Sequence, residues 1–296
     1  MTLQGYNAAF EDSDAALGEA VVLFRNLQSS LSAVIADGMA KLVDEPSWGL
    51  LHSIYERAEE QLQGCFVLIS NRYFAPAEAL CRTAIEAAVN LYYISLGDTG
   101  GKFLAYFKHY VEEERSQNQK WLKSIERSSH SEDDKDHHRH RIKNKDFALG
   151  QYEAFIKLLC QDEAREYKEI ERWPNAFQRF CEINKEVDYR TVYASLCSQS
   201  HNDAEDLLNK FIAGVCQDVE AKGAQKKENE DFALFMAVVA LATLVESAAI
   251  YLGKFSLGAN NKLLPILDQV RSLAQSISER PSMGGGGAQQ HVAGDV

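Results

Sequence analysis

The stretch "CRTAIEAAVNLYYI", residues 81–94, combines a nearly continuous apolar helix with two charged side chains one turn apart. At about 100° per residue, Arg82 and Glu86 share a stripe with Glu78 and Asn90, and the remaining surface is apolar or small. Such a stripe is either the solvent face of an ordinary helix, with Arg82 held by i,i+4 pairs, or a polar site inside a helical bundle. The stripe has no lysine, and an arginine between two carboxylates suits a buried, fork-like pairing.

Helical periodicity continues along most of the chain, without a convincing strand pattern or a fixed repeat. Five prolines in 296 residues are typical of long helices rather than of a turn-rich β fold. The sequence therefore predicts an all-α protein, a helical bundle of about eight helices. The expected helical segments are, approximately, residues 14–37, 46–69, 76–97, 102–127, 147–172, 175–181, 188–219, 232–255 and 261–278.

The domain organisation follows from where the apolar periodicity stops. We expect a single helical domain over residues 1–280. Within it, "SSHSEDDKDHHRHRIKNK", residues 128–145, predicts a mobile charged loop insertion, because almost none of its side chains can be buried in a core. The end of the chain, "PSMGGGGAQQHVAGDV", residues 281–296, predicts a flexible tail.

Composition excludes several classes of protein. A net charge of -12 argues against a protein coated with nucleic acid over its whole surface, although it permits a local basic site. None of the six cysteines forms a CxxC motif, so we expect reduced, mostly buried thiols rather than a disulfide framework or a zinc site. The N-terminus lacks the pattern of a secretory signal, and we expect a cytoplasmic protein.

One segment, "FALFMAVVALATLVESAAIYLG", residues 232–253, is long enough to span a bilayer. It is rich in alanine, however, and it contains Glu246, whose carboxylate would cost several kcal/mol in lipid. We therefore expect the central helix of a bundle and no membrane contact.

A second polar stripe lies in "DYRTVYASLCSQSHND", residues 188–203. Arg190, Tyr193, Cys197 and His201 fall within about 80° of each other on a helix, and we expect this side to face inward. Arg190 and His201 are about 16 Å apart along the axis and cannot grip one phosphate together. Either His201 and Tyr193 are core residues whose polar atoms are hydrogen-bonded, or the stripe is part of a polar site shared with Arg82.

If the two stripes meet, the candidate catalytic residues are Arg82, Glu86, Tyr193 and His201. Arg82 would neutralise phosphate charge, and His201 would transfer a proton while Glu86 or Tyr193 orients it. We assign no cofactor-binding and no metal-binding residues.

The two stripes also carry a resemblance. R-T-x-x-E is met by Arg82, Thr83 and Glu86, and Y-x-x-L-[S]-x-x-x-H is met by Tyr193 and His201, with Leu196 between them and Cys197 where serine is expected. In this order the motifs resemble a widespread bacterial family of helical proteins known only as a domain of unknown function, over about residues 45–255. Residues 202–203, Asn-Asp, depart from the proline and small hydroxyl residue of that pattern.

This family is similar in outline to the HEPN group of helical bundles, many of which are ribonucleases. That resemblance implies an R-x(4–6)-H motif acting on an RNA phosphate, but no histidine in this chain has an arginine at that distance upstream. The usual form of the ribonuclease motif is therefore absent, and likeness of fold alone supplies no function.

The segment "HHRHRIKNK", residues 137–145, is either a solvated loop, a weak metal site through His137 and His140, or a contact for a phosphate backbone. No phosphate loop, nucleophile elbow or H-E-x-x-H motif occurs.

Two functions remain open, so whether the protein is an enzyme is left undecided. The first is an interaction or effector protein whose buried Arg-Glu-Tyr-His network fixes helix register, with protein partners or further copies of itself. The second is a HEPN-like nuclease or nucleotide-processing enzyme, in a toxin or phage-defence setting, with RNA or a nucleotide as its partner.

Overall fold

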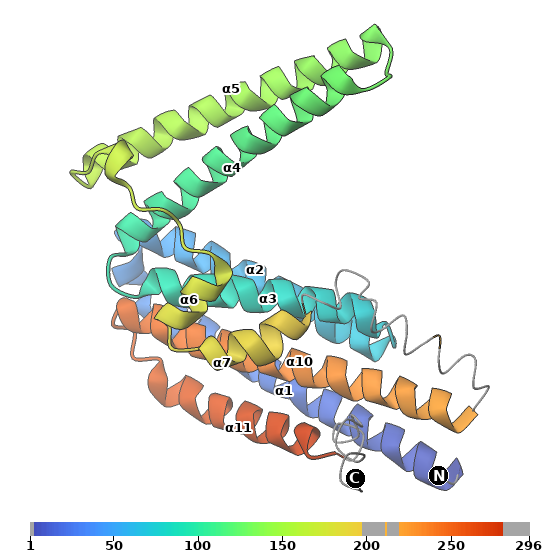
Figure 1. Cartoon of the computed structure of the whole chain (residues 1–296). Helices are drawn as coiled ribbons and strands as arrows, with labels where there is room; N and C mark the ends of the chain where they lie inside the picture. Colours follow the sequence, from blue (N-terminus) through green and yellow to red (C-terminus); the bar gives the residue numbers. More distant parts are fainter. Residues whose placement is uncertain (1–2, 197–210, 212–218, 281–296) are drawn as a thin grey trace, which may run out of the picture. The chain divides into compact units, whose positions relative to one another are not determined.

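The computed structural model describes residues 3–196, 211 and 219–280. These residues form nine α-helices, one 3₁₀ turn and one π-helical turn, and contain no strand (Figure 1), which confirms the all-α bundle. The elements are α1 (Leu3–Leu42), α2 (Pro46–Ser70), α3 (Phe74–Ser95), α4 (Thr99–Arg127), α5 (Glu132–Asp162), η1 (Tyr167–Glu169), α6 (Ala176–Glu182), α7 (Glu186–Asp188), η2 (Tyr189–Tyr193), α10 (Val219–Lys254) and α11 (Asn260–Ser278).

The chain divides into two compact units. Unit 1 contains Met1–Ser95 and Ala176–Val296, and unit 2 contains Leu96–Asn175. The single domain that we expected over residues 1–280 stays a prediction. The tail expected at 281–296 lies outside the described residues.

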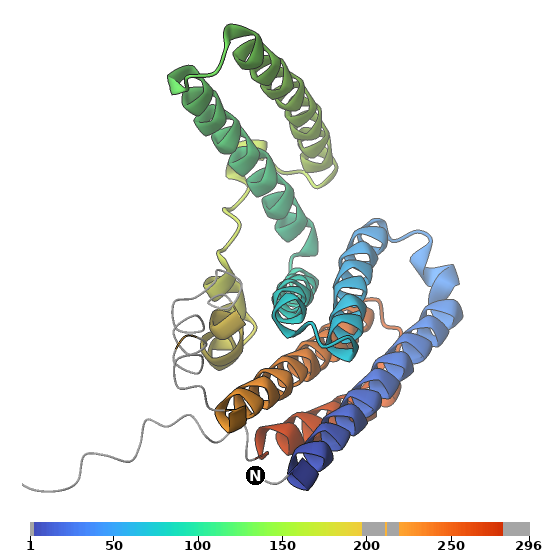
Figure 2. The same cartoon turned by 90° about the vertical axis from the view of Figure 1, so that its right-hand side faces the viewer.

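In unit 1, α10 is the central helix and packs against α1, α2, α3 and α11. Figure 2 shows α1, α10 and α11 running side by side. Over Lys227–Lys254, α10 is long and apolar enough to cross a bilayer, the only such helix among the described residues, and 67% of its most apolar window is buried in the protein. Fully buried side chains of this core include Leu27, Tyr55, Leu62, Leu91, Ile94, Leu241 and Tyr251.

Ion pairs connect several helices of unit 1. Arg72, in the turn between α2 and α3, donates to Asp14 of α1 at 2.8 Å and to the buried Glu230 of α10. The next residue, Asp231, is fully buried and accepts from Arg280, just beyond α11, at 2.9 Å. Carboxylates this deep are tolerated because cations lie against them.

Stacked rings join α2 to α10. Trp48 and His52 of α2 stack on Tyr251 of α10, with ring centroids 5.5 and 6.5 Å away. His52 Nδ1 also lies 3.1 Å from the Tyr251 hydroxyl. Among the cysteines that the structure describes, Cys65 of α2 and Cys81 of α3 are free, buried thiols with sulfur atoms 2.9 Å apart.

Unit 2 is built on α4 and α5, which form a helical hairpin, here called the α4–α5 hairpin. Their short connection, residues 128–131, makes the two helices antiparallel neighbours. The buried cluster of the hairpin comprises Leu104, Val111, Leu149, Ile156 and Cys160. At its base, Asp98 caps α4 by accepting from the Gly101 amide at 3.0 Å, and it pairs with Arg165.

Residues 128–145 differ from the expected loop, because only residues 128–131 connect the helices and α5 begins at Glu132. Ser131 caps α5 by accepting from the Asp134 amide, and three acidic residues in the first turn complement the positive end of the helix. Arg139 then reaches across the hairpin to Glu126 at 2.8 Å. A charged segment without apolar periodicity thus becomes helical because its charges pair along the helix and across to α4.

Candidate functional site

The candidate site begins on α3. The apolar side of this helix is buried, and its polar stripe of Glu78, Arg82, Glu86 and Asn90 is not fully exposed to solvent. Glu78 is buried, and Arg82 and Glu86 are partly buried. The stripe therefore contacts other parts of unit 1 and is more than a solvent-exposed face.

Glu86 joins three elements through one carboxylate. Its Oε1 accepts from Arg179 Nη2 of α6 at 3.1 Å, and its Oε2 accepts from the Tyr193 hydroxyl of η2 at 2.8 Å. Arg179 is only 4% exposed, so this guanidinium is a buried cation that depends on its partners. Both oxygens of Glu86 are thus occupied by donors that lie far along the chain.

Tyr193 is placed by aromatic neighbours as well as by Glu86. Its ring packs on Phe180 and Tyr189, with centroids 5.3 and 5.4 Å away. The Arg82 guanidinium lies over the same ring, 5.6 Å from its centroid. Burial, and then the negative charge of Glu86, raises the pKa of Tyr193 well above its ordinary value. At neutral pH the phenol is therefore protonated and donates to the carboxylate.

The expected inward stripe is only partly correct. Tyr193 is buried, but the side chain of Arg190 is 63% exposed and pairs with Glu186 at 2.8 Å. The local helix explains the difference, because Tyr189–Tyr193 is a π-helical turn with i→i+5 hydrogen bonds. Spacings of three and four residues do not define one face in such a turn.

The remaining members of the predicted site cannot be placed. Cys197 and His201 lie outside the described residues. The structure therefore brings together Arg82, Glu86 and Tyr193 of the four candidate residues, and the proximity of His201 to Arg82 stays a prediction.

Sequence reasoning missed two cations of the same segment. One is Arg179, and the other is Lys185, whose ammonium lies 2.8 Å from Glu246 of α10 and 3.2 Å from Asp188. Burial, followed by the charge of Glu246, raises the pKa of the neighbouring Tyr92. The only sequence signal was that Arg179 is next to Phe180, in a short helix that also contains Phe177 and Cys181.

The arrangement is suited to holding helices together and is poorly prepared for proton transfer. A carboxylate that accepts from a guanidinium and a phenol is not a free base, and a phenol with a raised pKa is not a nucleophile at neutral pH. The described residues contain no group of three or more His, Cys, Asp or Glu side chains placed to hold a metal ion.

Replacing Glu86 should reveal whether its carboxylate stabilises the bundle. We expect Glu86→Ala to lower the free energy of unfolding by about 2 kcal/mol, because the buried Arg179 guanidinium loses an anionic partner. Thermal melting followed by circular dichroism measures the change. Glu186→Ala is the matched control, since it breaks an exposed Arg–Glu pair that contributes roughly 0.5 kcal/mol or less. Equal melting of the two variants would contradict a stabilising role for Glu86.

The raised pKa of Tyr193 predicts a specific pH dependence. The folded protein holds the phenolic proton more tightly than the unfolded chain, whose tyrosines titrate near about pH 10. The contribution of Tyr193 to stability is therefore complete below about pH 9 and is lost as the pH rises beyond about 10. Urea unfolding at pH 8 and at pH 10.5 should show a smaller alkaline loss for Tyr193→Phe than for the wild type. Identical losses would mean that Tyr193 does not titrate in this way.

Comparison with known proteins agrees with one part of the resemblance, which is membership of a family of unknown function. Residues 49–218 match a family described as "Family of unknown function (DUF5677)", and this range includes Arg82, Glu86, Tyr193 and His201. A search of curated proteins found no match, and a search of solved structures found none. The match covers more than half of the chain, and the protein therefore belongs to the DUF5677 family of helical proteins of unknown function.

Proposed function

We propose that this DUF5677 protein is a non-catalytic interaction protein, and that the α4–α5 hairpin carries its recognition surface. The observation that supports this most directly is a row of exposed apolar side chains on α5. Unit 1 contributes a scaffold in which Glu86, Glu230 and Glu246 pair with cations of the same unit. The proposal includes a cytoplasmic location, where the thiols of Cys65 and Cys81 stay reduced.

The row consists of Phe147, Phe155 and Leu158, here called the α5 stripe. Their exposed fractions are 70%, 57% and 53%. At 100° per residue they lie about 140–220° around the helix axis from Ile142. The opposite, buried side of α5 is formed by Ile142, Leu149, Ile156 and Cys160.

A helix that is apolar on two opposite sides normally has neighbours on both. In the described part of unit 2, α4 covers one of these sides, and the α5 stripe stays exposed on the other. Exposed aromatic side chains on one face of a helix are enriched where proteins associate. The α5 stripe is therefore supported as a contact surface.

A second copy of the same chain fits the stripe. When two α5 helices pair antiparallel about Gln151, Phe147 of each copy faces Phe155 of the other. The same register places His140 of one copy opposite Asp162 of the other, where an imidazole and a carboxylate can form a hydrogen bond. Such a contact is isologous and closed, as expected for a dimer.

Disrupting the α5 stripe should abolish self-association. One helix pair buries less than a standard interface, so we expect a reversible dimer with a Kd on the order of 10 µM. In sedimentation velocity across micromolar concentrations, the wild type should shift toward a dimer. The double variant Phe147→Ser/Phe155→Ser should stay monomeric. Val67→Ser, at an exposed apolar position of α2, is the matched control and should dimerise normally.

The antiparallel register of the dimer can be tested separately. Gln151 lies on the symmetry axis, so Gln151→Cys should form an intermolecular disulfide under mild oxidation, while the wild type with its native cysteines should not. A wild type that is monomeric at every concentration, or a double variant that still dimerises, would overturn the proposed surface.

The enzyme hypothesis is supported by the contact of Tyr193 with Glu86 and by the position of Arg82 over the same ring. It also requires His201, which lies outside the described residues. The two functions differ in one measurement, the length of mixed RNA after incubation with wild type and with His201→Ala. Our proposal expects intact RNA with both proteins. If the wild type shortens the RNA and His201→Ala does not, the nuclease function replaces our proposal.

A further inference from the structure

The distal part of the α4–α5 hairpin has a surplus of positive charge in an otherwise acidic protein. Residues 115–145 contain nine Lys and Arg and five Asp and Glu, together with four His. The whole chain has 31 Lys and Arg and 43 Asp and Glu. A local basic surface is therefore present, of the kind that the net charge did not exclude.

The acidic residues of this region do not neutralise the surface evenly, because Arg139 collects most of them. It lies 2.8 Å from Glu126, 2.6 Å from Asp136 and 3.5 Å from Glu132. Glu132 is shared with Lys135 at 3.1 Å. The consequence is that other cations of the hairpin are left without a carboxylate.

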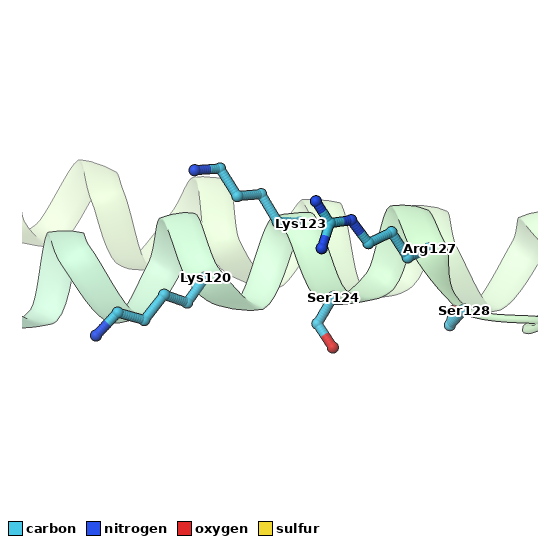
Figure 3. A pocket seen from close by; sticks show the side chains of 5 residues that line it. All are labelled: Lys120, Lys123, Ser124, Arg127 and Ser128. Carbon is cyan, nitrogen blue, oxygen red and sulfur yellow. The ribbon is translucent and has the colours of Figure 1, made fainter.

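Three of these cations line one open groove on α4. Lys120, Lys123 and Arg127 surround a space of about 510 Å³, together with the hydroxyls of Ser124 and Ser128 (Figure 3). Within the described chain, none of the three forms an ion pair. They lie on one side of the helix, and Lys120 and Arg127 are about 10 Å apart along its axis.

The groove offers charge without an apolar or aromatic platform. Leu122, the nearest exposed apolar side chain on α4, lies about 200° around the axis from Lys120. The Trp121 ring is covered by Arg141, whose guanidinium lies 5.6 Å from its centroid, and it contacts His138 edge to face. The groove therefore suits a phosphate backbone better than a stacked base or the insertion of side chains into a lipid surface.

We propose that the groove of Lys120, Lys123 and Arg127 binds the phosphate backbone of a single-stranded nucleic acid. Three cations spread over about 10 Å of the helix can each contact a different phosphate of one strand. The hydroxyl of Ser124 donates a further hydrogen bond to a phosphate oxygen. Because no base edge is contacted, binding is independent of sequence. The site uses α4 alone and does not depend on the α5 stripe.

Fluorescence anisotropy with a labelled twenty-nucleotide oligouridine tests this site in the full chain. Neutralising three phosphates predicts that log K falls against log salt with a slope of about -2. The triple variant Lys120→Gln/Lys123→Gln/Arg127→Gln should bind about thirtyfold more weakly than the wild type. The matched control is Arg57→Gln/Lys168→Gln/Arg271→Gln, which removes the same charge from exposed, paired cations and should stay within about twofold.

Two further measurements distinguish nucleic acid from other polyanions and from anionic membranes. Vesicles containing phosphatidylserine should not bind, and polyglutamate should compete poorly with the oligouridine. A wild type that does not bind the oligouridine, or equal losses in the two triple variants, would overturn the site. Binding of vesicles that is lost in the Lys120→Gln/Lys123→Gln/Arg127→Gln variant, with oligouridine binding unchanged, would assign the groove to a membrane surface instead.

Discussion

The carboxylate of Glu86 is the interaction on which the structure of unit 1 around residues 176–193 depends. That segment has little regular structure of its own, since α6 and α7 are short and η2 is a single π turn. It is held to α3 because Glu86 accepts from both Arg179 and Tyr193. It is held to α10 because Lys185 reaches Glu246. Two acidic side chains on two helices that pack together thus fix three donors of one short segment, and each donor is the reason its acid can be partly buried.

Whether a feature of the fold could be predicted from the sequence depends on how far apart along the chain the residues that determine it lie. The helices of unit 1 were predicted because apolar periodicity is local and continuous in α2, α3 and α10. The contact of Tyr193 with Glu86 was anticipated because two polar stripes on apolar helices favoured a shared interior. The ion pairs of Arg179 and Lys185 were not anticipated. The partner lies roughly a hundred positions away along the chain for Arg179 and roughly sixty for Lys185, and tertiary packing that no local pattern encodes brings each pair together. Arg190 was placed on the wrong side because a π turn changes which residues share a face.

The prediction of a loop at the start of α5 was wrong for a different reason. Its charged residues have no apolar periodicity, and the helix forms because Ser131 caps it and because charges pair within α5 and with α4. A sequence window contains only one of the two helices, so the pairing of Arg139 with Glu126 is invisible to it. The same pairing determines the surface, because carboxylates gathered by Arg139 are withdrawn from Lys120, Lys123 and Arg127. One arginine thus stabilises the hairpin and leaves its outer face positive.

The two units therefore use polar chemistry in opposite ways. In unit 1 the carboxylates Glu86, Glu230 and Glu246 pair with cations of the same unit, and both oxygens of Glu86 accept hydrogen bonds from other parts of the fold. A catalytic base needs an acceptor that can exchange partners during a reaction, and Glu86 would have to release Arg179 or Tyr193 first, exposing a buried charge. In unit 2 the cations Lys120, Lys123 and Arg127 of α4 and the apolar side chains of the α5 stripe face solvent. Contact of these groups with a ligand or a partner would not require any internal contact to break, and this difference is the physical reason for our proposal that the hairpin, rather than the network around Glu86, carries the function.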